Sequence, residues 1–236
     1  MHYLNKPVYA KHVIYEVTQK LPLPEESSSL DRSFRREDSV ARLVLAGAEM
    51  LCEHSYAAMG VDHVLRRTGQ SRSKGSFYHF FPSKEAFWLE TIKYYADHFY
   101  RKLERILDNQ STPALDRLST YVNEGIERFN FKRGCLIGNL SQELGPASTV
   151  FSLPLEDVLQ RWQAYVARCL RAVADSGELV SDINEQGRAD FFWIGWEGAL
   201  IRAKASASSD PVRRFASQFI RVLPKSSTVY RRGPAL

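Results

Sequence analysis

Residues 60–84, GVDHVLRRTGQSRSKGSFYHFFPSK, contain two short helical patterns separated by a basic, hydroxyl-rich turn. The first pattern carries apolar residues at helical spacing, namely Val61, Val64 and Leu65. It ends at Thr68 and Gly69, and a second short helix is predicted over residues 73–81, where Pro82 stops it. Two short helices joined by a tight turn predict a helix-turn-helix.

The second of these helices has the residue types that suit contact with duplex DNA. The N-terminus of a recognition helix enters the major groove, where short side chains allow the backbone to come close. Cationic and hydroxyl side chains there meet phosphates or base edges. The candidates are Ser71, Arg72, Ser73, Lys74, Gly75 and Ser76, with polar tips from Tyr78 and His79. Phe77, Phe80 and Phe81 are instead expected to hold the helix on its neighbours. A solvated basic turn inside an ordinary helical bundle is the alternative.

The charge around this segment favours the same interpretation. The whole chain has a formal net charge of +5, which is modest. Residues 32–84, however, hold nine basic and five acidic side chains. A local excess of this kind is expected of a phosphate-binding face, although a solvated charged surface can have it too.

The run KGSFYHFFPSKEAF, with GVDHVL a short turn upstream, resembles the DNA-binding segment of the TetR family of bacterial one-component repressors. The resemblance implies an all-α protein, with an N-terminal three-helix helix-turn-helix domain and a C-terminal helical domain for ligand binding and dimerisation. It places Tyr78 and Lys84 where family members hold phosphates. It places Lys74, Gly75, Ser76 and His79 on the groove-facing helix. Between HVL and KGSFYH lie eight residues, RRTGQSRS, where the family pattern has six, so operator affinity could be weakened or its sequence preference shifted.

Composition bounds the class of protein. With 236 residues, of which 44% are hydrophobic, the chain can form a small domain and a larger one. It lacks an apolar run of about 18 residues and a signal-peptide pattern, so we expect a cytoplasmic protein with no membrane partner. The three cysteines, Cys52, Cys135 and Cys169, have no CxxC spacing, which argues against a disulfide framework and a metal site. No GxGxxG, GxxxxGK[ST], HExxH or GxSxG pattern is present, and no cofactor is expected.

Four segments are predicted along the chain: a flexible arm over residues 1–36, the DNA-binding domain over 37–84, the ligand-binding and dimerisation domain over 85–224, and a tail over 225–236. Prolines and a serine run break the arm, whose arginines could alternatively reach a minor groove. Helices are expected over residues 37–54, 84–107, 115–129, part of 134–144, 155–176, 188–205 and 211–222. Gly177 is predicted to end one of them, and Cys169 to lie in the core.

The helix predicted over 188–205 is apolar nearly all round. Its large apolar residues are Phe191, Phe192, Trp193, Ile194, Trp196, Leu200 and Ile201, while Gly195 and Gly198 permit close helix contact. Such a helix needs cover on every side. We therefore expect a homodimer, with a four-helix interface built from residues 155–176 and 188–205 of each protomer.

Two further stretches, KRGCLIGNLSQELG and FFWIGWEGALIRAKASASSDP, resemble one branch of the same family. This branch comprises the acrylate-responsive repressors and the repressor of N-ethylmaleimide reductase, which respond to small electrophiles. The resemblance implies that Cys135 is a sensing cysteine and that Lys204 can approach it. A nearby ammonium lowers the pKa of a thiol and raises the thiolate fraction that attacks electrophiles. A buried cysteine and a solvated lysine are the alternative.

A small apolar pocket with a few polar groups is expected around this pair. Its candidate lining residues are Tyr95, Phe99, Asn139, Trp162, Trp193, Trp196 and Glu197. Aromatic residues at helical spacing suit an ordinary core equally well.

The sequence thus predicts a ligand-responsive transcriptional repressor that binds palindromic operator DNA as a dimer. A small-molecule inducer, either an electrophile or a small carboxylate such as acrylate, would release it. A helical thiol-dependent enzyme is a poorer interpretation, because it would need a histidine near Cys135 and none follows His98. A helical scaffold without a DNA role is a third possibility, and it would lack salt-dependent binding to duplex DNA.

Overall fold

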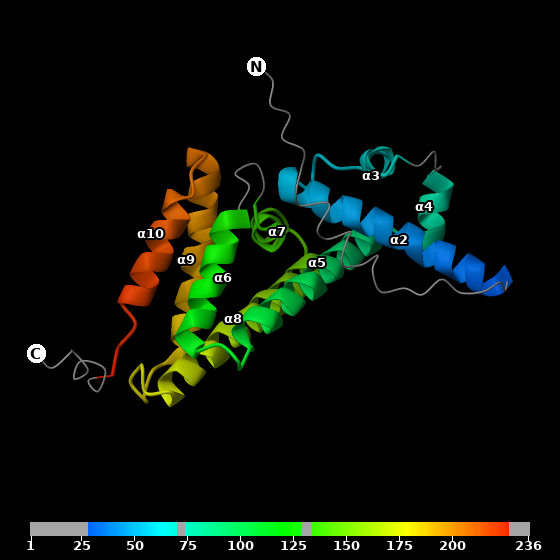
Figure 1. The fold of residues 1–236 in the computed structure, drawn as a ribbon. Coiled ribbons are helices and arrows are strands. Elements are labelled where there is room, and N and C mark those ends of the chain that lie inside the picture. The colour runs from blue at the N-terminus through cyan, green and yellow to red at the C-terminus, as the bar shows by residue number, and fades with distance from the viewer. Residues whose placement is uncertain (1–27, 70–73, 129–133, 227–236) are drawn as a thin grey trace, which may run out of the picture. The chain divides into compact units, whose positions relative to one another are not determined.

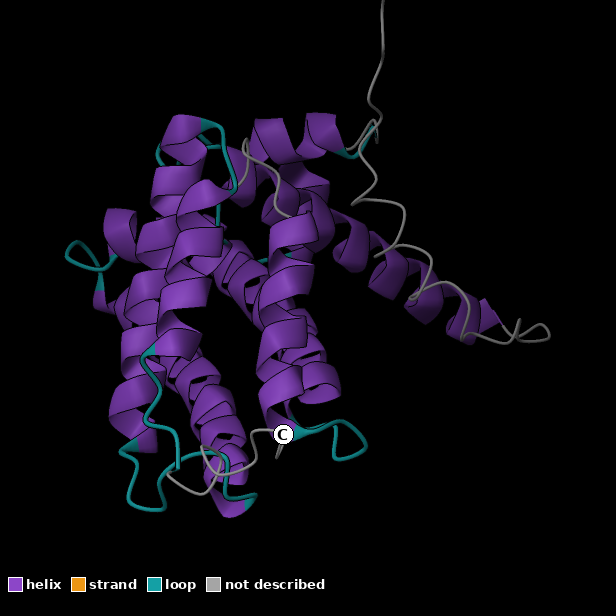
Figure 2. Ribbon diagram, turned by 60° about the vertical axis from the view of Figure 1, so that its left-hand side comes forward, coloured by secondary structure: helices purple, strands orange, loops and turns teal. Residues whose placement is uncertain are grey.

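The computed structural model describes residues 28–69, 74–128 and 134–226, with side chains described from residue 36. Within these residues the chain folds into nine α-helices. Loops and turns join the helices (Figures 1 and 2). The helices are α2 (Ser28–Glu53), α3 (Val61–Arg67), α4 (Lys74–Phe80), α5 (Lys84–Leu107), α6 (Ala114–Arg128), α7 (Leu136–Leu144), α8 (Thr149–Asp175), α9 (Glu185–Ser206) and α10 (Asp210–Arg221). The predicted all-α class is confirmed.

The first described helix, α2, starts earlier than predicted. The expected start was residue 37, yet the backbone is helical from Ser28. The reason is that residues 28–53 contain no proline and only Gly47, so no residue stops the helix from extending toward its N-terminus. The rest of the predicted arm, residues 1–27, lies outside the described residues. The chain divides into two compact units, residues 1–39 and 40–236.

Helices α3 and α4 form the predicted pair of short helices. The C-cap of α3 is Thr68, and Gly69 follows with φ +64°, a left-handed conformation that glycine adopts readily. Phe77 and Phe81 are buried, and their rings lie 5.1 and 4.9 Å from that of Phe87. These contacts attach the apolar side of α4 to α5, as predicted.

The long helix α5 begins at the predicted cap. The Ser83 hydroxyl accepts a hydrogen bond from the Ala86 amide at 3.0 Å, which satisfies one of the free donors at the helix start. At Gly47 on α2, an added Cβ would lie 2.7 Å from the Phe87 ring. Glycine therefore allows α2 and α5 to approach closely.

Helices α8 and α9 also start earlier than predicted. The expected start of α8 followed Pro154, but the helix begins at Thr149 and includes this proline. Near a helix start a proline removes only one backbone hydrogen bond, and Phe151 in the added turn is buried against the Tyr56 ring at 5.5 Å. The N-cap of α9 is Asn184, whose side chain accepts a hydrogen bond from the Gly187 amide at 2.9 Å.

The predicted end of α8 is confirmed. Gly177 has φ +80° directly after the C-cap Ser176, and the Glu178 amide donates to the Val173 carbonyl at 3.3 Å. Cys169 is buried, as predicted, and its thiol donates to the Ala114 carbonyl at 3.4 Å. Burial raises the pKa of this thiol to about 11.

The core of the C-terminal part is built around α8, which packs against α5, α6, α7 and α9. The largest fully buried side chain on α8 is Trp162. Helix α10 lies along α9 (Figure 1), where a Cβ on Gly195 would overlap the Phe215 ring. After α10, the Val180 amide donates to the Pro224 carbonyl at 3.0 Å. None of the described helices is both long and apolar enough to cross a membrane.

Candidate functional site

The exposed side of α4 carries the predicted DNA-reading residues. Lys74, Gly75, Tyr78 and His79 are exposed, whereas Phe77 is buried on the opposite side. Ser76, a further candidate, is partly buried. The candidates Ser71, Arg72 and Ser73, with residue 70, are half of the eight-residue stretch RRTGQSRS and lie outside the described residues.

Lys74, the first residue of α4, forms an ion pair with α3. Its Nζ lies 2.9 Å from Asp62 Oδ2, and both side chains are largely exposed. The hydrogen bond to Asp62 raises the pKa of Lys74, so the ammonium is the stable form. Exposed pairs of this type stabilise the fold little. A phosphate can therefore replace Asp62 at small cost.

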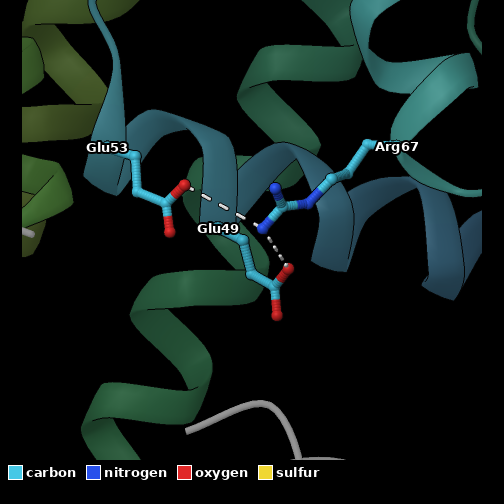
Figure 3. Close-up of polar contacts among 3 residues, drawn as sticks. All are labelled: Glu49, Glu53 and Arg67. Carbon is cyan, nitrogen blue, oxygen red and sulfur yellow. Dashed lines mark hydrogen bonds and ion pairs between the residues drawn. The ribbon is translucent and has the colours of Figure 1, made fainter. Parts of the chain in front are cut away.

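Arg67, at the end of α3, contacts α2 instead of projecting freely (Figure 3). Its guanidinium lies 3.4 Å from the Glu49 carboxylate and 3.9 Å from that of Glu53. These contacts hold the last turn of α3 on α2. Arg67 and Lys74 are thus both paired within the protein, and their acidic partners are among the five acids counted in residues 32–84, so the local charge excess is unchanged.

Lys84 lies at the start of α5, against the loop that joins α2 and α3. Its Nζ is 4.7 Å from the centre of the Tyr56 ring, a cation–π distance. The same ring contacts Trp88 edge-on at 6.0 Å. The Tyr56 and Trp88 rings thus determine where the ammonium of Lys84, the predicted phosphate contact, lies.

Cys135 occupies the N-cap of α7. Its Sγ accepts a hydrogen bond from the Gly138 amide at 3.4 Å. Its thiol also hydrogen-bonds to the carboxyl group of Glu197 on α9. A Cβ on Gly138 would overlap this carboxyl group, so only glycine allows α7 and Glu197 to be this close.

The electrostatics of Cys135 contradict the prediction made for Lys204. Burial and the neighbouring Glu197 carboxylate raise the pKa of the thiol well above its ordinary value. Lys204 is exposed, seven residues beyond Glu197 on α9, or about 10 Å along the helix axis. The expectation that its ammonium lowers the pKa of Cys135 is wrong, because the charged group beside the thiol is an acid. A sensing role for Lys204 stays a prediction.

Glu197 and Tyr95 complete the polar part of this cluster. Burial raises the pKa of Glu197 from 4.5 to about 7, although the hydrogen bond from Cys135 acts in the opposite direction. Burial raises the pKa of Tyr95 as well, and its hydroxyl accepts a hydrogen bond from the Leu136 amide. At neutral pH the cluster therefore holds a protonated thiol, a protonated phenol and a carboxyl group that is about half ionised.

An aromatic row continues from this cluster into the core. The Tyr95 and Phe99 rings stack at 6.2 Å, and Phe99 lies 4.3 Å from Trp162. Trp162 in turn lies 5.1 Å from Trp193. Both indole N–H groups are buried without an acceptor among the described residues. Four of the predicted pocket residues thus form a continuous row that joins the Cys135 cluster at Tyr95.

Two predicted pocket residues are placed differently. Trp196 packs on α6, where its ring lies 5.6 Å from that of Tyr121 and where a Cβ on Gly125 would lie 2.8 Å from it. It belongs to the core rather than to the row. Asn139 lies against Gly134, whose added Cβ would be 2.8 Å from the Asn139 side-chain oxygen. This contact positions Gly134, the residue directly before Cys135.

Both ends of α7 are hydrogen-bonded to residues near the end of α2 and in the α2–α3 loop. Before its start, the Gly134 amide donates to the Cys52 carbonyl near the end of α2 at 3.1 Å. Near its end, the Glu143 carboxylate accepts hydrogen bonds from the Tyr56 and Ala57 amides, each at 2.7 Å. Sequence reasoning missed Glu143, because no local pattern distinguishes it from the other acidic residues.

Comparison with known proteins places these features in a family. Residues 43–91 match the family model "Bacterial regulatory proteins, tetR family", and residues 112–219 match "Tetracyclin repressor-like, C-terminal domain". The chain is 40% identical over 180 residues to the transcriptional regulator AcuR of Cereibacter sphaeroides, covering 75% of this chain and 81% of AcuR. It is 30% identical over 188 residues to the transcriptional repressor DhaR of a Mycobacterium species, covering 79% of this chain and 93% of DhaR.

A solved structure supports the same assignment. The regulatory protein TetR from Rhodobacter sphaeroides superposes with a TM-score of 0.72 at 39% identity, covering 78% of this chain and 97% of that protein. Members of this family regulate transcription by binding DNA and are not enzymes. The helix-turn-helix, the helical C-terminal part and these similarities show that the chain belongs to the tetR family of bacterial regulatory proteins.

Proposed function

We propose that the protein is a ligand-responsive repressor that binds a palindromic operator as a dimer and is released when a small electrophile reaches Cys135. The observation that carries this proposal is the position of α7. Its N-cap is the candidate sensing cysteine, and the same helix holds the α2–α3 loop through Glu143. A change at the thiol therefore has a short physical route to the DNA-binding segment.

Operator contact is assigned to the exposed side of α4 together with Lys84. Lys74, Tyr78 and His79 project from one side of a short helix whose other side is buried. Such a helix fits the major groove, where cationic and hydroxyl groups meet phosphates and base edges. The Asp62 carboxylate holds the Lys74 ammonium in place until a phosphate replaces this carboxylate.

Dimerisation is assigned to α9, with α10 beside it. Phe191, Ile194 and Ile201 are 50%, 66% and 50% exposed, and Gly198 between them has open space around it. Positions 191, 194, 198 and 201 follow the three-and-four spacing of a helix-packing seam. Charged residues such as Glu156 and Arg161 are exposed on α8, which the sequence placed in the interface, and α10 likewise exposes Arg213 and Arg214, so the interface is assigned to α9.

Release follows from linkage between the two sites. A ligand can shift the protein away from its DNA-binding state only as far as it binds the two states differently. An adduct on Cys135 removes the S–H that hydrogen-bonds to Glu197, whereas Sγ can still accept from the Gly138 amide. Movement of α7 would then alter the amide contacts of Glu143 and the position of α3 and α4.

The row of aromatic rings supports a small unsaturated carbonyl compound as the ligand. The buried indole N–H groups of Trp162 and Trp193 are donors available to a carbonyl or carboxylate oxygen. The likeness of the Cys135 segment to the electrophile-responsive branch points to the same chemistry. Acrylate and its neutral amide are therefore the first probes.

The proposal is tested by gel-shift titration of the operator upstream of the gene, with and without acrylate or acrylamide, at two salt concentrations. We expect salt-sensitive binding that either compound releases. Cys135→Ser should bind the operator like the wild type and resist release. Cys169→Ser, which keeps a donor for Ala114 in the core, is the matched control and should respond normally. Equal release of Cys135→Ser and wild type would remove this cysteine from the mechanism.

A further inference from the structure

The Cys135 thiol and the Glu197 carboxyl group form an acid–base pair. They are hydrogen-bonded, and Glu197 lies so close to Gly138 that no side chain fits between them. Among the described residues, which leave out 129–133, the ionisable groups that face this pair are Cys52 from α2 and Tyr95 from α5. Neither is a cation, and Lys204 is exposed two helical turns away.

The geometry points to Glu197 as the proton acceptor that activates Cys135 for addition to uncharged α,β-unsaturated carbonyl compounds. This inference rests on the proposed role of Cys135 as the sensor. It adds a chemical role for Glu197 and narrows the class of ligand.

A proton acceptor is needed because the thiol alone is a poor nucleophile. Burial and Glu197 keep the pKa of Cys135 well above its ordinary value, so few molecules hold a thiolate at neutral pH. Glu197, with a pKa of about 7, is ionised in about half of the molecules at that pH. It is already hydrogen-bonded to the thiol, the geometry that general-base catalysis requires.

The reaction balances within the site. With acrylamide, a bond forms between Cys135 Sγ and the β-carbon, and the π electrons of the carbon–carbon double bond shift toward the carbonyl oxygen. The thiol proton passes to a carboxylate oxygen of Glu197 and then to the α-carbon as the double bond re-forms at the carbonyl. The carboxylate is regenerated, and the thiol and acrylamide together become one thioether.

The charge of Glu197 also selects the ligand. The carboxyl group must be ionised to accept the proton, and in that state it repels an acrylate anion at contact distance. An amide, ester or aldehyde of the same size meets no such repulsion. Uncharged acceptors are therefore favoured over acrylate, increasingly so as the pH rises from 6 to 8.

The experiment measures the rate at which purified full-length protein is alkylated by acrylamide between pH 6 and 9, with Cys135 followed by peptide mass spectrometry. Acrylamide is used because it does not titrate in this range. The wild-type rate should rise with a midpoint near pH 7 and then level off. Glu197→Gln should react about a hundredfold more slowly at pH 7.5, a loss typical of a removed general base. Glu197→Asp should recover part of the rate, and Glu156→Gln, an exposed acid on α8, should match the wild type.

The opposite result for Glu197→Gln would overturn the inference. If the carboxylate only suppresses thiolate formation through its charge, removing it lowers the pKa of Cys135, and the variant reacts as fast as the wild type or faster. Should Glu197→Gln fail to fold, the wild-type profile decides: a rate that climbs about tenfold per pH unit throughout reports a free thiolate and rejects the base.

The ligand class and the proposed function are tested separately. Acrylate that outpaces acrylamide at Cys135, each relative to its reaction with free cysteine at the same pH, would reject the preference for uncharged acceptors. No alkylation of Cys135 in any variant would reject the sensing chemistry itself and the role of Glu197 with it. Alkylation through Glu197 that leaves operator binding unchanged would keep this inference and remove the proposed regulatory function.

Discussion

At the scale of single residues, the position of Glu197 has the largest consequences. Its carboxyl group is accommodated because residue 138 is glycine, and its hydrogen bond to Cys135 follows from that approach. A partly buried acid beside a thiol, with no cation facing it in the part of the chain that the structure describes, is costly to ionise. Its protonation should therefore affect the stability of the fold.

The stability of the protein should fall as the pH rises through the Glu197 transition. The folded pKa, about 7, exceeds the ordinary value of 4.5, so between these values the folded state binds more protons than the unfolded state. The stabilisation is complete below about pH 4.5 and lost by about pH 8. Glu197→Gln should thus be more stable than the wild type at pH 8 by about 1–3 kcal/mol. Urea denaturation at pH 5 and pH 8 measures this, and a gap of the same size at both pH values would contradict it.

At the scale of secondary-structure elements, α4 and α7 have different proposed roles. Helix α4 presents Lys74 to solvent, where this side chain forms an ion pair with Asp62 on the neighbouring α3. Helix α7 carries the Cys135 thiol at its start and the Glu143 carboxylate near its end. One helix is thus assigned to DNA contact, and the other to communication between the thiol and the α2–α3 loop.

Lys74→Ala should weaken operator binding without changing the reaction of Cys135. A lysine that contacts one phosphate contributes about one unit to the slope of log affinity against log salt, so this slope should fall by about 1. Asp62→Asn removes the competing carboxylate and should strengthen binding slightly. Fluorescence anisotropy titrations at several salt concentrations measure both effects. An unchanged slope for Lys74→Ala would show that this residue does not contact DNA.

Glu143→Gln should separate sensing from release. The neutral amide has one acceptor oxygen, so it cannot hold the Tyr56 and Ala57 amides as the carboxylate does. We expect a loss of about 1–3 kcal/mol in stability, because the removed hydrogen bonds are charge-assisted. Cys135 should be alkylated at the wild-type rate, but complete alkylation should release less operator. Full release in a folded variant would exclude Glu143 from the coupling route, with Glu156→Gln as the control.

At the scale of the whole molecule, the proposed function requires a second copy of the chain. The exposed seam on α9 consists of Phe191, Ile194, Gly198 and Ile201, on a helix whose other sides pack against α8 and α10. Exposed apolar side chains in such a row mark a protein interface. The proposed binding to two operator half-sites depends on this contact, because a palindromic operator is read by a two-fold dimer.

Ile194→Glu should yield a folded monomer that no longer binds the operator tightly. The side chain is 66% exposed in the protomer, so the substitution leaves the core intact and places a charge in the seam. Leu153→Glu is the matched control, since Leu153 is 71% exposed on α8 outside the seam and should leave the dimer unchanged. Analytical ultracentrifugation with circular dichroism distinguishes the outcomes. A monomer from Leu153→Glu and a dimer from Ile194→Glu would move the interface to α8.

The helices themselves follow from local sequence, and so most of them could be predicted. Apolar spacing, the Ser83 cap and Gly177 act within a few residues of each helix. The predicted starts of α2, α8 and α9 were wrong. At these starts the sequence has either a proline that the helix accommodates, Pro154, or a run of polar residues, and neither fixes the first residue of the helix. Tertiary contacts, such as that of Phe151 with Tyr56, decide how far such a helix extends.

What the sequence alone determined is the helical class, the helix-turn-helix and the choice of Cys135 as the residue to examine. What only the tertiary structure decided is which charges surround that cysteine. Helical periodicity depends on neighbours three or four residues apart, whereas the pairing of Cys135 with Glu197 joins residues 62 positions apart through the packing of α7 and α9. The same is true of Glu143, whose partners Tyr56 and Ala57 lie 87 and 86 residues away. No local pattern records such distances, so the acid beside the thiol and the contact with the α2–α3 loop emerge only once the helices are packed.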